Sequence, residues 1–286
     1  MRIARLAGIE VDRRTQDCLA LLDRDAPRDY RELAVLIARE WERKPPARVG
    51  LAGGQGAGKS TLGALVESAA KELGLHVCVL SLDDFYLPKR QRRAFAEQNH
   101  PIFETRGPPG THDMTLCAAS LAALAETREV RLPVFDKGVD DRVSERVAEG
   151  PFDVVMLEGW CVGARAVAES ELLEPLNTLE AERDTQGIWR RTVNRALRDE
   201  YEPVWDSLDS LVNLGVPSID AVRRWRTQQE QARPVDRRMN ADEIDYFVQH
   251  YERITLRMLK DQSRSADWYV RLDEEHRIEA VSVRAR

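Results

Sequence analysis

The sequence lacks the features of a membrane protein, a secreted protein, or a small protein stabilised by zinc or disulfides. No apolar run approaches the length of a membrane span, and the N-terminal stretch MRIARLAGIEVDRR has no long apolar core of the signal-peptide kind. The four cysteines are widely scattered, without the close pairs of a zinc site or compact disulfide framework. We therefore expect a cytoplasmic protein with no membrane partner, in which Cys78 and Cys117 are core thiols.

A strong positive charge is also missing. The 286 residues include 43 Lys and Arg against 49 Asp and Glu, which gives a formal net charge of −6. A nucleic-acid partner is therefore not expected, although local arginines can still hold small anions. Neither an internal repeat nor a low-complexity linker is present. We expect residues 1–47 to form an N-terminal helical cap and residues 48–286 to form one elaborated domain.

The most informative stretch is RVGLAGGQGAGKST, residues 48–61, which contains the G-x-x-x-x-G-K-[ST] pattern of a phosphate-binding P-loop. A short apolar run precedes the glycines and a helix-periodic segment, 62–73, follows them, which is the required order of strand, loop and helix. Because of this context, the alternative of a glycine-rich turn that binds no ligand is the weaker one. Binding of a nucleoside triphosphate is predicted for Gly53, Gly54, Gln55, Gly56, Ala57, Gly58, Lys59, Ser60 and Thr61.

The residue types of this loop suit phosphate chemistry. Glycines let the backbone N–H groups turn inward toward phosphate oxygens at the positive end of the following helix. Lys59 is expected to reach the β- and γ-phosphates, and the Ser60 hydroxyl to complete the shell of a Mg²⁺ ion.

Carboxylates follow two further predicted strands. The run 76–82 ends in Asp83 and Asp84, and the apolar run 152–157 ends in Glu158. Functional groups of open α/β folds collect at the carboxyl ends of strands, so an aspartate there would meet the γ-phosphate, and Glu158 fits a Walker B position that serves Mg²⁺. One aspartate of the pair can instead cap the following turn.

Other segments leave two interpretations open. The basic stretch 88–110 is typical of a solvated loop or helix face, and Asp113 can be a helix N-cap, a substrate contact or both. The arginines at 223, 224 and 226 can form a lid over the phosphates or simply an exposed basic face.

Further helices are predicted over 115–127, 163–175, 187–205 and 242–262, strands over 129–135 and 210–214, and a terminal hairpin within 268–283.

Together these motifs resemble the P-loop kinases of the phosphoribulokinase and uridine kinase superfamily. Within it the chain is most similar to plant-type D-glycerate 3-kinases and their microbial relatives, from about residue 48 onward. The resemblance implies an α/β P-loop NTPase fold with a mainly parallel sheet flanked by helices. The residue patterns add the N-terminal helical cap and the C-terminal hairpin to this fold. The segments that carry the resemblance are 53–61, SLDDFY (81–86), GTHD (110–113), LPVFDK (132–137), DR (141–142), LEGW (157–160), YEPVWD (201–206), RWR (224–226) and DYFV (245–248).

The resemblance also implies a reaction. It predicts in-line transfer of the γ-phosphoryl group of ATP, with Mg²⁺, to a hydroxyl of a small hydroxylated acid, most simply D-glycerate giving 3-phosphoglycerate. Asp83 then orients the acceptor hydroxyl, and Asp113 binds substrate hydroxyls. The predicted catalytic residues are Lys59, Asp83 and Arg142, and the predicted metal residues are Ser60 and Glu158. The predicted substrate-binding residues are Asp84, Tyr86, Arg106, His112, Asp113, Lys137 and Arg142.

Two alternatives stay open. A kinase for another small acceptor, such as a nucleoside, a pantothenate-like acid or a sugar phosphate, would share these residues. A nucleotide-switch or assembly protein is the rival from a different class, but Asp83 and the Asp113 turn suggest an acceptor pocket that a switch does not need. No base-reading motif separates ATP from GTP, and the oligomeric state is left open.

Overall fold

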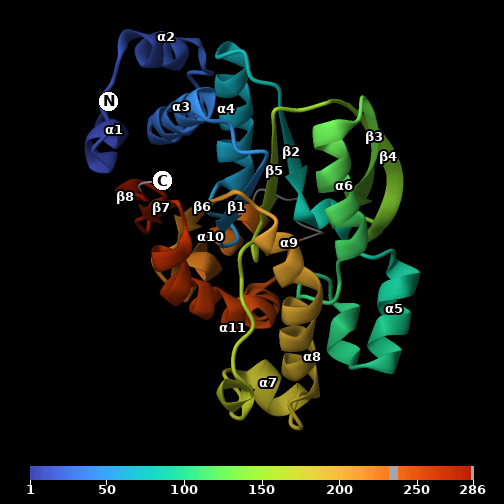
Figure 1. Ribbon diagram of the computed structural model, residues 1–286. Helices are drawn as coiled ribbons and strands as arrows, with labels where there is room; N and C mark the ends of the chain where they lie inside the picture. The colour runs from blue at the N-terminus through green and yellow to red at the C-terminus, as the bar shows by residue number, and fades with distance from the viewer. Residues whose placement is uncertain (232–237, 285–286) are drawn as a thin grey trace.

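A six-stranded, mainly parallel sheet lies at the centre of the molecule (Figure 1). The computed structural model describes residues 1–231 and 238–284. The strands lie in the order β2-β5-β1-β6-β7-β8, and only β8 runs antiparallel to its neighbour. They are β1 (Arg48–Gly53), β2 (Val77–Ser81), β5 (Val154–Gly159), β6 (Ser210–Gly215), β7 (Trp268–Leu272) and β8 (Ile278–Val283).

The central strands are buried on both faces. Every residue of β5 is buried, and so are five of the six residues of β1, which explains their nearly continuous apolar sequences. The predicted mainly parallel α/β fold and the C-terminal hairpin, β7–β8, are confirmed. The carboxyl ends of β1, β2 and β5 meet at one edge of the sheet, because their pairing is parallel and in register.

Three N-terminal helices cover one end of this sheet, as predicted for a helical cap (Figure 1). They are α1 (Arg2–Ala7), α2 (Arg13–Leu21) and α3 (Arg28–Arg43), and α3 packs along α4 (Lys59–Glu72), the helix that follows the P-loop. Leu33, Leu36, Ile37 and Trp41 of α3 are buried in one hydrophobic cluster with Leu51 of β1. The cap therefore shares a core with the sheet.

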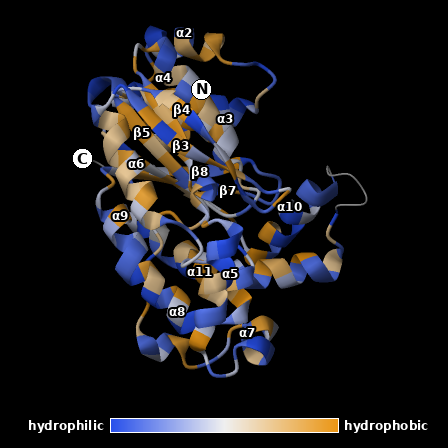
Figure 2. Ribbon diagram, turned by 90° about the vertical axis from the view of Figure 1, so that its right-hand side faces the viewer, coloured by the Kyte–Doolittle hydropathy of each residue, from blue (hydrophilic) through white to orange (hydrophobic). Residues whose placement is uncertain are grey.

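The remaining helices come from the middle and end of the chain, and α10 packs through Val222 and Trp225 in the first hydrophobic cluster. Figure 2 shows α6 as hydrophobic along much of its length and α5 as mostly hydrophilic, which matches the burial of α6 in a second hydrophobic cluster. The bounds are α5 (Lys89–Gln98), α6 (Met114–Glu126), α7 (Thr178–Arg183), α8 (Ile188–Ala196), α9 (Glu202–Asp206), α10 (Ile219–Gln231) and α11 (Ala241–Ser265). A π-helical turn, Leu197–Tyr201, joins α8 to α9.

A separate antiparallel hairpin, β3 (Glu129–Asp136) and β4 (Asp141–Glu149), lies beside α6 (Figure 1). The sequence does not predict β4 because it buries only Ala148 and exposes polar residues along most of its length. The stretch 88–110, left open as a loop or a helix face, contains α5 followed by a short 3₁₀ turn, Pro101–Glu104.

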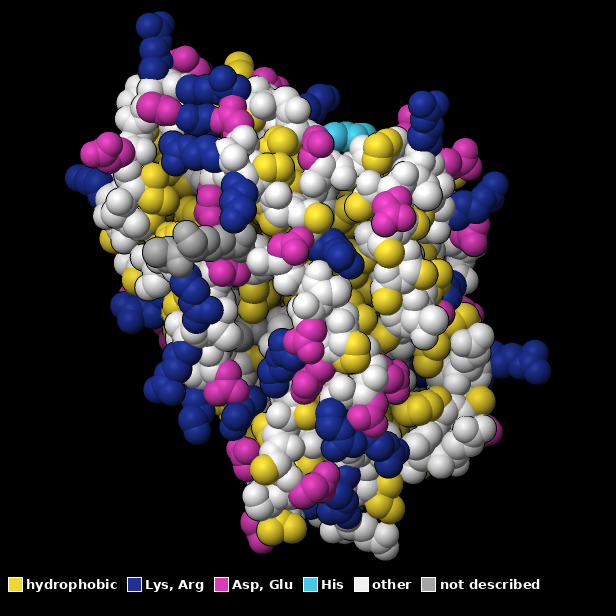
Figure 3. Space-filling model, viewed as in Figure 1, with side chains coloured by type: hydrophobic (Ala, Val, Ile, Leu, Met, Phe, Trp, Pro, Cys, Tyr) yellow, Lys and Arg dark blue, Asp and Glu magenta, His cyan; other side chains and the backbone are white. Residues whose placement is uncertain are grey.

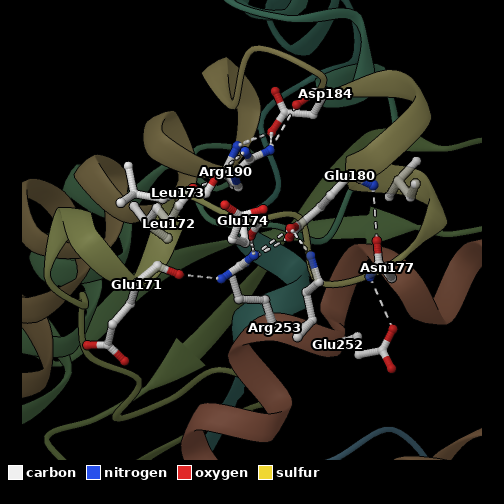
Figure 4. A network of polar contacts seen from close by, with 12 residues as sticks. Glu171, Leu172, Leu173, Glu174, Asn177, Glu180, Asp184, Arg190, Glu252 and Arg253 are labelled. Carbon is white, nitrogen blue, oxygen red and sulfur yellow. Dashed lines mark hydrogen bonds and ion pairs between the residues drawn. The ribbon is translucent and has the colours of Figure 1, made fainter.

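The predicted helix over 163–175 is wrong, since only a 3₁₀ turn, Glu169–Leu172, forms there. Arginine side chains donate hydrogen bonds to backbone carbonyls that would accept from backbone N–H groups in a helix (Figure 4). Arg253 of α11 donates to the carbonyls of Glu171 and Glu174, at 2.9 Å each, and Arg190 of α8 donates to those of Leu172 and Leu173. This tertiary contact stabilises an irregular backbone that sequence periodicity cannot reveal.

The face of the molecule in Figure 3 carries no single dominant charge. On the face seen in Figure 3, Lys and Arg side chains are interspersed with Asp and Glu. Within residues 1–231 and 238–284, no helix combines the length and apolar character that crossing a membrane requires.

Candidate active site

The loop between β1 and α4 has backbone geometry that only glycine adopts comfortably. Gly56 and Gly58 have φ of +82° and +80°, in the left-handed region. A Cβ on Gly56 would lie 2.7 Å from Cβ of Trp225, and one on Gly58 would lie 2.9 Å from Cε1 of Tyr30. Neighbouring elements therefore approach this loop so closely that both positions require glycine.

Two distant parts of the chain hold the outer side of the loop. The Tyr30 hydroxyl of α3 donates a hydrogen bond to the Ala57 carbonyl at 2.7 Å. From the β7–β8 turn, Nε2 of His276 lies 3.0 Å from the Gly56 carbonyl oxygen. The N-terminal cap and the C-terminal hairpin thus both fix the P-loop backbone.

Lys59 and Ser60 start α4 and face the carboxyl end of β5. Lys59 Nζ donates to the carbonyls of Gly53 and Gly54, at 2.9 and 3.1 Å. Burial lowers the pKa of Lys59, against the opposing effect of the nearby carboxylates of Glu158 and Asp83. An ammonium group at the helix start can neutralise phosphate oxygens.

The pair of Ser60 and Glu158 fits a magnesium ion. The Ser60 hydroxyl donates to Glu158 Oε1 at 2.9 Å, while Oε2 of the same carboxylate is buried without a hydrogen-bond partner in residues 1–231 and 238–284. Mg²⁺ is commonly held by one or two protein oxygens together with waters and phosphate oxygens. Glu158 Oε2, a buried oxygen that can still accept a hydrogen bond or bind a metal, lies beside the Ser60 hydroxyl and matches that set of ligands. The part of the chain that is described contains no cluster of three or more His, Cys, Asp or Glu suited to a metal.

These residues line a cavity of about 430 Å³. That volume lies within the range of about 300 to 1,000 Å³ that is usual for small-molecule sites. Of the predicted site residues, it brings together Gln55, Gly56, Gly58, Lys59, Ser60, Thr61, Asp83, Tyr86, Arg106, Lys137 and Glu158. The remaining lining residues are Ser81, Gly159, Trp160, Arg226, Gln229, Phe247 and Tyr251.

Asp83 faces the P-loop across this cavity. It follows β2 in a 3₁₀ turn, Leu82–Phe85, and its Oδ2 lies 2.5 Å from Nζ of Lys137. Burial acts to raise the pKa of Asp83, but the ion pair and hydrogen bond from Lys137, with help from His112 and Lys59, more than offset it and lower the pKa. Asp83 is therefore a carboxylate at neutral pH.

The turn of the β3–β4 hairpin delivers Lys137 to Asp83. Asp140 in that turn accepts hydrogen bonds from Arg92 Nη2 at 2.5 Å and from Arg106 Nη1 at 2.6 Å. The next carboxylate, Asp141, accepts from the backbone N–H of Lys89 at 2.8 Å. The hairpin turn is therefore tied to α5 and to Arg106, which explains how a solvent-exposed hairpin can position a cation in the cavity.

Arg106 precedes a tightly packed turn. Its carbonyl accepts from the Tyr251 hydroxyl of α11 at 3.0 Å, and the Gly107 carbonyl accepts from Nε1 of Trp160 at 3.2 Å. Gly107 has φ of +128°, and a Cβ there would lie 2.1 Å from the Tyr251 hydroxyl oxygen. The sequence did not single out Trp160 or Tyr251 as cavity residues, although Trp160 stands in the segment LEGW that carries the family resemblance.

His112 lies outside the cavity, behind Tyr86. Their rings stack with centroids 4.2 Å apart, and Nδ1 of His112 lies 2.7 Å from the Tyr201 hydroxyl. Burial lowers the pKa of His112 to about 3, although Asp83 acts in the opposite direction, so this imidazole is neutral. His112 supports the Tyr86 ring from behind.

Three more predicted substrate residues are not among those that line the cavity. The Asp84 carboxylate accepts from the Phe135 backbone N–H at 3.3 Å, and burial raises its pKa. Asp113 caps α6 by accepting from the Leu116 N–H at 3.0 Å, as its N-cap interpretation predicted. Arg142 Nη2 lies 3.3 Å from the Asp113 carboxylate, so this arginine forms an ion pair with the residue that caps α6.

The three candidate lid arginines separate clearly. Arg226 lines the cavity, with its guanidinium carbon 4.8 Å from the centre of the Phe247 ring. Arg223 forms ion pairs with Asp220, Asp245 and Glu252, Arg224 pairs with Glu274, and Arg226 itself pairs with Glu230 at 2.5 Å. Arg226 is thus the candidate that faces the P-loop.

Several known proteins are similar in sequence to this chain. The fission yeast (Schizosaccharomyces pombe) protein named "Uncharacterized kinase mug58" is 34% identical over 236 residues, which are 76% of this chain and 83% of the relative. A uridine kinase from Brevibacillus brevis is 29% identical over 58% of this chain and 72% of its own length. This chain belongs to the P-loop kinases of the phosphoribulokinase and uridine kinase superfamily. No family model matches it.

One further relative and two solved structures are also similar to this chain. The chloroplastic D-glycerate 3-kinase of Arabidopsis thaliana is 30% identical over 72% of this chain, which spans only 46% of that longer protein. A solved D-glycerate 3-kinase from Cryptococcus neoformans has a TM-score of 0.69 at 24% identity, covering 95% of this chain and 99% of its own. The solved YGR205w protein has a TM-score of 0.72 at 23% identity, covering 90% and 99%. At these identities the solved structures show the fold alone. The sequence relatives show that the protein is a kinase with a small-molecule substrate.

Proposed function

We propose that this kinase uses ATP and Mg²⁺ to phosphorylate D-glycerate, giving 3-phosphoglycerate. The observation that carries the proposal is one cavity in which the P-loop faces an ionised aspartate paired with Lys137, and which Arg106 also lines. The kinase class follows from the sequence relatives. We infer the acceptor from the side of the cavity that carries Asp83, Arg106 and Lys137, and from the similarity to D-glycerate 3-kinases.

The P-loop side of the cavity binds the nucleotide. Backbone N–H groups of the loop and the Lys59 ammonium neutralise the phosphates, while Ser60 and Glu158 would hold Mg²⁺ directly or through water. When bound, the ion supplies charge neutralisation between the β- and γ-phosphates. Arg226 approaches from α10 and would add a second positive charge near the transferring group.

Asp83 orients the acceptor hydroxyl. Its carboxylate accepts the hydroxyl hydrogen, which turns a lone pair of the acceptor oxygen toward the γ-phosphorus. Because phosphoryl transfer depends mainly on positioning and electrostatic stabilisation, a carboxylate whose pKa is lowered is adequate for this role. The new bond forms between the acceptor oxygen and the γ-phosphorus as the bond to the β-phosphate oxygen of ADP breaks, and the hydroxyl proton leaves through Asp83.

The acceptor side selects a small anion. A carboxylate placed near Arg106 and Lys137 would gain charge-assisted hydrogen bonds, and Tyr86 offers a hydroxyl on the same wall. D-Glycerate combines one carboxylate with two hydroxyls, so it can satisfy these groups while presenting a hydroxyl to Asp83. Uridine has no carboxylate, which is why we favour the acid over the nucleoside.

The chain organisation supports a related proposal. We infer that residues 48–286 form one domain on which residues 1–47 act as a permanent cap, because Leu33 and Trp41 of α3 share a hydrophobic cluster with Leu51 of β1. A cytoplasmic location stays a prediction from the sequence.

The test is Mg²⁺-dependent release of ADP by the purified protein with D-glycerate, L-glycerate, uridine, pantothenate and ribulose 5-phosphate. We expect a selective increase with D-glycerate and 3-phosphoglycerate as the product by NMR. A selective increase with another acceptor would keep the kinase and replace the substrate. Slow hydrolysis that no acceptor accelerates would favour the nucleotide-switch alternative.

A further inference from the structure

Arg226 forms an ion pair with a buried residue of its own helix. Its Nη2 atom lies 2.5 Å from Oε1 of Glu230, one helical turn further along α10. The Glu230 side chain is only 2% exposed, whereas the Arg226 side chain is 16% exposed and lines the P-loop cavity. Glu230 is not among the described residues that line this cavity. A buried carboxylate therefore holds an arginine that reaches the site.

The same carboxylate also contacts the backbone that leads into α11. Oε2 of Glu230 accepts a hydrogen bond from the Met239 N–H at 3.2 Å, two residues before α11 begins at Ala241. Further along α11, the Phe247 ring lies against the Arg226 guanidinium, with its centre 4.8 Å from the guanidinium carbon. Glu230 thus fixes Arg226 and the start of the helix that supplies the aromatic contact.

The backbone that carries Arg226 is packed closely against the P-loop. A Cβ on Gly56 would lie 2.7 Å from Cβ of Trp225, the residue before Arg226. The Trp225 indole donates to the Glu274 carbonyl at 3.0 Å, and its ring stacks on His276 with centroids 4.0 Å apart. Because these contacts fix the backbone of α10 beside the loop, the direction of the long Arg226 side chain is what remains to be set.

Holding an arginine in one direction has an entropic cost. A free arginine side chain samples many rotamers, and most of that freedom is lost when its guanidinium group binds a phosphate. An arginine that Glu230 and Phe247 already restrict loses less of it. The guanidinium group has five N–H donors, so Nη2 can stay on Glu230 while other N–H groups contact phosphate oxygens.

We propose that Glu230 is a positioning residue, which holds Arg226 in the direction that phosphoryl transfer requires. Glu230 acts through the arginine and does not contact the nucleotide itself. The inference rests on the proposed function in one respect, because it takes Arg226 to stabilise charge on the transferring group. It does not depend on which acceptor the enzyme uses.

A double-mutant cycle tests this role. Glu230→Gln removes the charge but keeps an oxygen that can accept from the Met239 N–H, Arg226→Gln removes the guanidinium group, and a third protein carries both changes. The measurements are kcat and KM for ATP from acceptor-dependent ADP release, together with urea unfolding of each protein. Asp220→Asn is the matched control, because it neutralises another carboxylate of α10, whose partner Arg223 is not among the described cavity residues.

We expect Arg226→Gln to lower kcat about 100-fold, which is typical for loss of a group that stabilises transition-state charge. Glu230→Gln should lower kcat about tenfold and change KM for ATP less, the size expected when the rotamer freedom of one arginine returns. In the Arg226→Gln protein, the further change at Glu230 should alter kcat less than about twofold, because its effect passes through the arginine. Asp220→Asn should keep kcat near that of the wild type.

A purely structural role for Glu230 predicts a different pattern. Glu230→Gln would then lower the urea midpoint while the folded protein kept its kcat, or the losses in kcat from the two single changes would multiply in the double variant. Either result would overturn the proposal.

A second measurement needs neither a Glu230 variant nor an acceptor. In protein labelled with ¹⁵N-arginine, a guanidinium group that is held in place rotates slowly and gives separate Nη signals, and the spectrum of Arg226→Lys identifies those of Arg226. We expect separate Arg226 signals both before and after a non-hydrolysable ATP analogue is added. Averaged Nη signals in the free protein or in the complex would overturn the proposal even if Glu230→Gln did not fold.

Failure of the proposed function would be distinguishable from failure of this inference. Wild-type protein that does not bind the analogue would overturn the inference together with nucleotide use. If the wild type binds the analogue but does not phosphorylate D-glycerate, only the acceptor is rejected, and the Nη signals of Arg226 still decide whether Glu230 holds the arginine.

Discussion

Replacing Asp83 with Asn tests the proposed mechanism most directly. The amide has nearly the shape of the carboxylate, but it loses the ion pair with Lys137 at 2.5 Å and can no longer accept a proton from the acceptor hydroxyl. Residues in this role typically contribute about 100- to 10,000-fold to the rate, or about 3 to 5 kcal/mol of transition-state stabilisation. We therefore expect Asp83→Asn to lower kcat by that factor.

The affinity for ATP should change little, because the proposed nucleotide contacts lie on the P-loop, on the opposite wall of the cavity. The assay is glycerate-dependent ADP release for kcat, combined with calorimetry for ATP binding. A loss of ATP affinity as large as the loss of kcat would move Asp83 from the acceptor to the nucleotide.

Asp84→Asn provides the matched control, since it makes the same chemical change at the adjacent residue. The Asp84 carboxylate accepts from the Phe135 N–H and is not among the residues that line the cavity. This variant should lose about 1 kcal/mol of unfolding free energy at most and keep kcat near that of the wild type. The reasoning would be refuted if Asp83→Asn kept kcat within a few fold of wild type, or if Asp84→Asn lost as much.

Three further predictions concern neighbouring residues. Lys137 lowers the pKa of Asp83 against the effect of burial, and the Asp83 carboxylate is protonated as the pH falls through that pKa. Lys137→Met should therefore raise the pKa of Asp83 and move the acidic limb of the kcat/KM profile to higher pH. An acidic limb that does not move would count against the pairing of Lys137 with Asp83. Arg106→Gln should raise KM for glycerate about 10-fold or more, the cost of a lost charged hydrogen bond, and leave KM for ATP nearly unchanged; equal increases would place Arg106 on the phosphates. Tyr30→Phe removes the hydrogen bond to the Ala57 carbonyl and should lower the unfolding free energy by about 1 kcal/mol in urea titrations, an effect that would be absent if that bond contributed nothing.

Much of the fold follows from local sequence patterns. The buried strands β1 and β5 are nearly continuous apolar runs, and Gly56 and Gly58 mark a loop that needs left-handed backbone angles, so both could be predicted without coordinates. Because parallel strands align their carboxyl ends, the same patterns place Ser60, Asp83 and Glu158 at one edge of the sheet.

Elements stabilised by long-range contacts could not be predicted in this way. Strand β4 has almost no buried residues, and it forms because it pairs with β3. The segment 163–175 has apolar residues at helical spacing, yet Arg190 and Arg253 from distant helices bind its carbonyls in an irregular path. In both cases the stabilising partner lies far away in the sequence.

The sequence by itself determined the chemistry at the P-loop, because phosphate binding depends on residues that are consecutive along the chain. The tertiary structure decided which other residues face that loop. It placed Arg106, Lys137 and Arg226 in the cavity, while Asp84, His112, Asp113 and Arg142 lie outside its lining. It also brought Tyr30 and His276, 246 positions apart in the sequence, onto adjacent carbonyls of one loop. The physical reason is that short-range geometry is encoded locally, whereas the second wall of a cavity exists only after distant elements have packed.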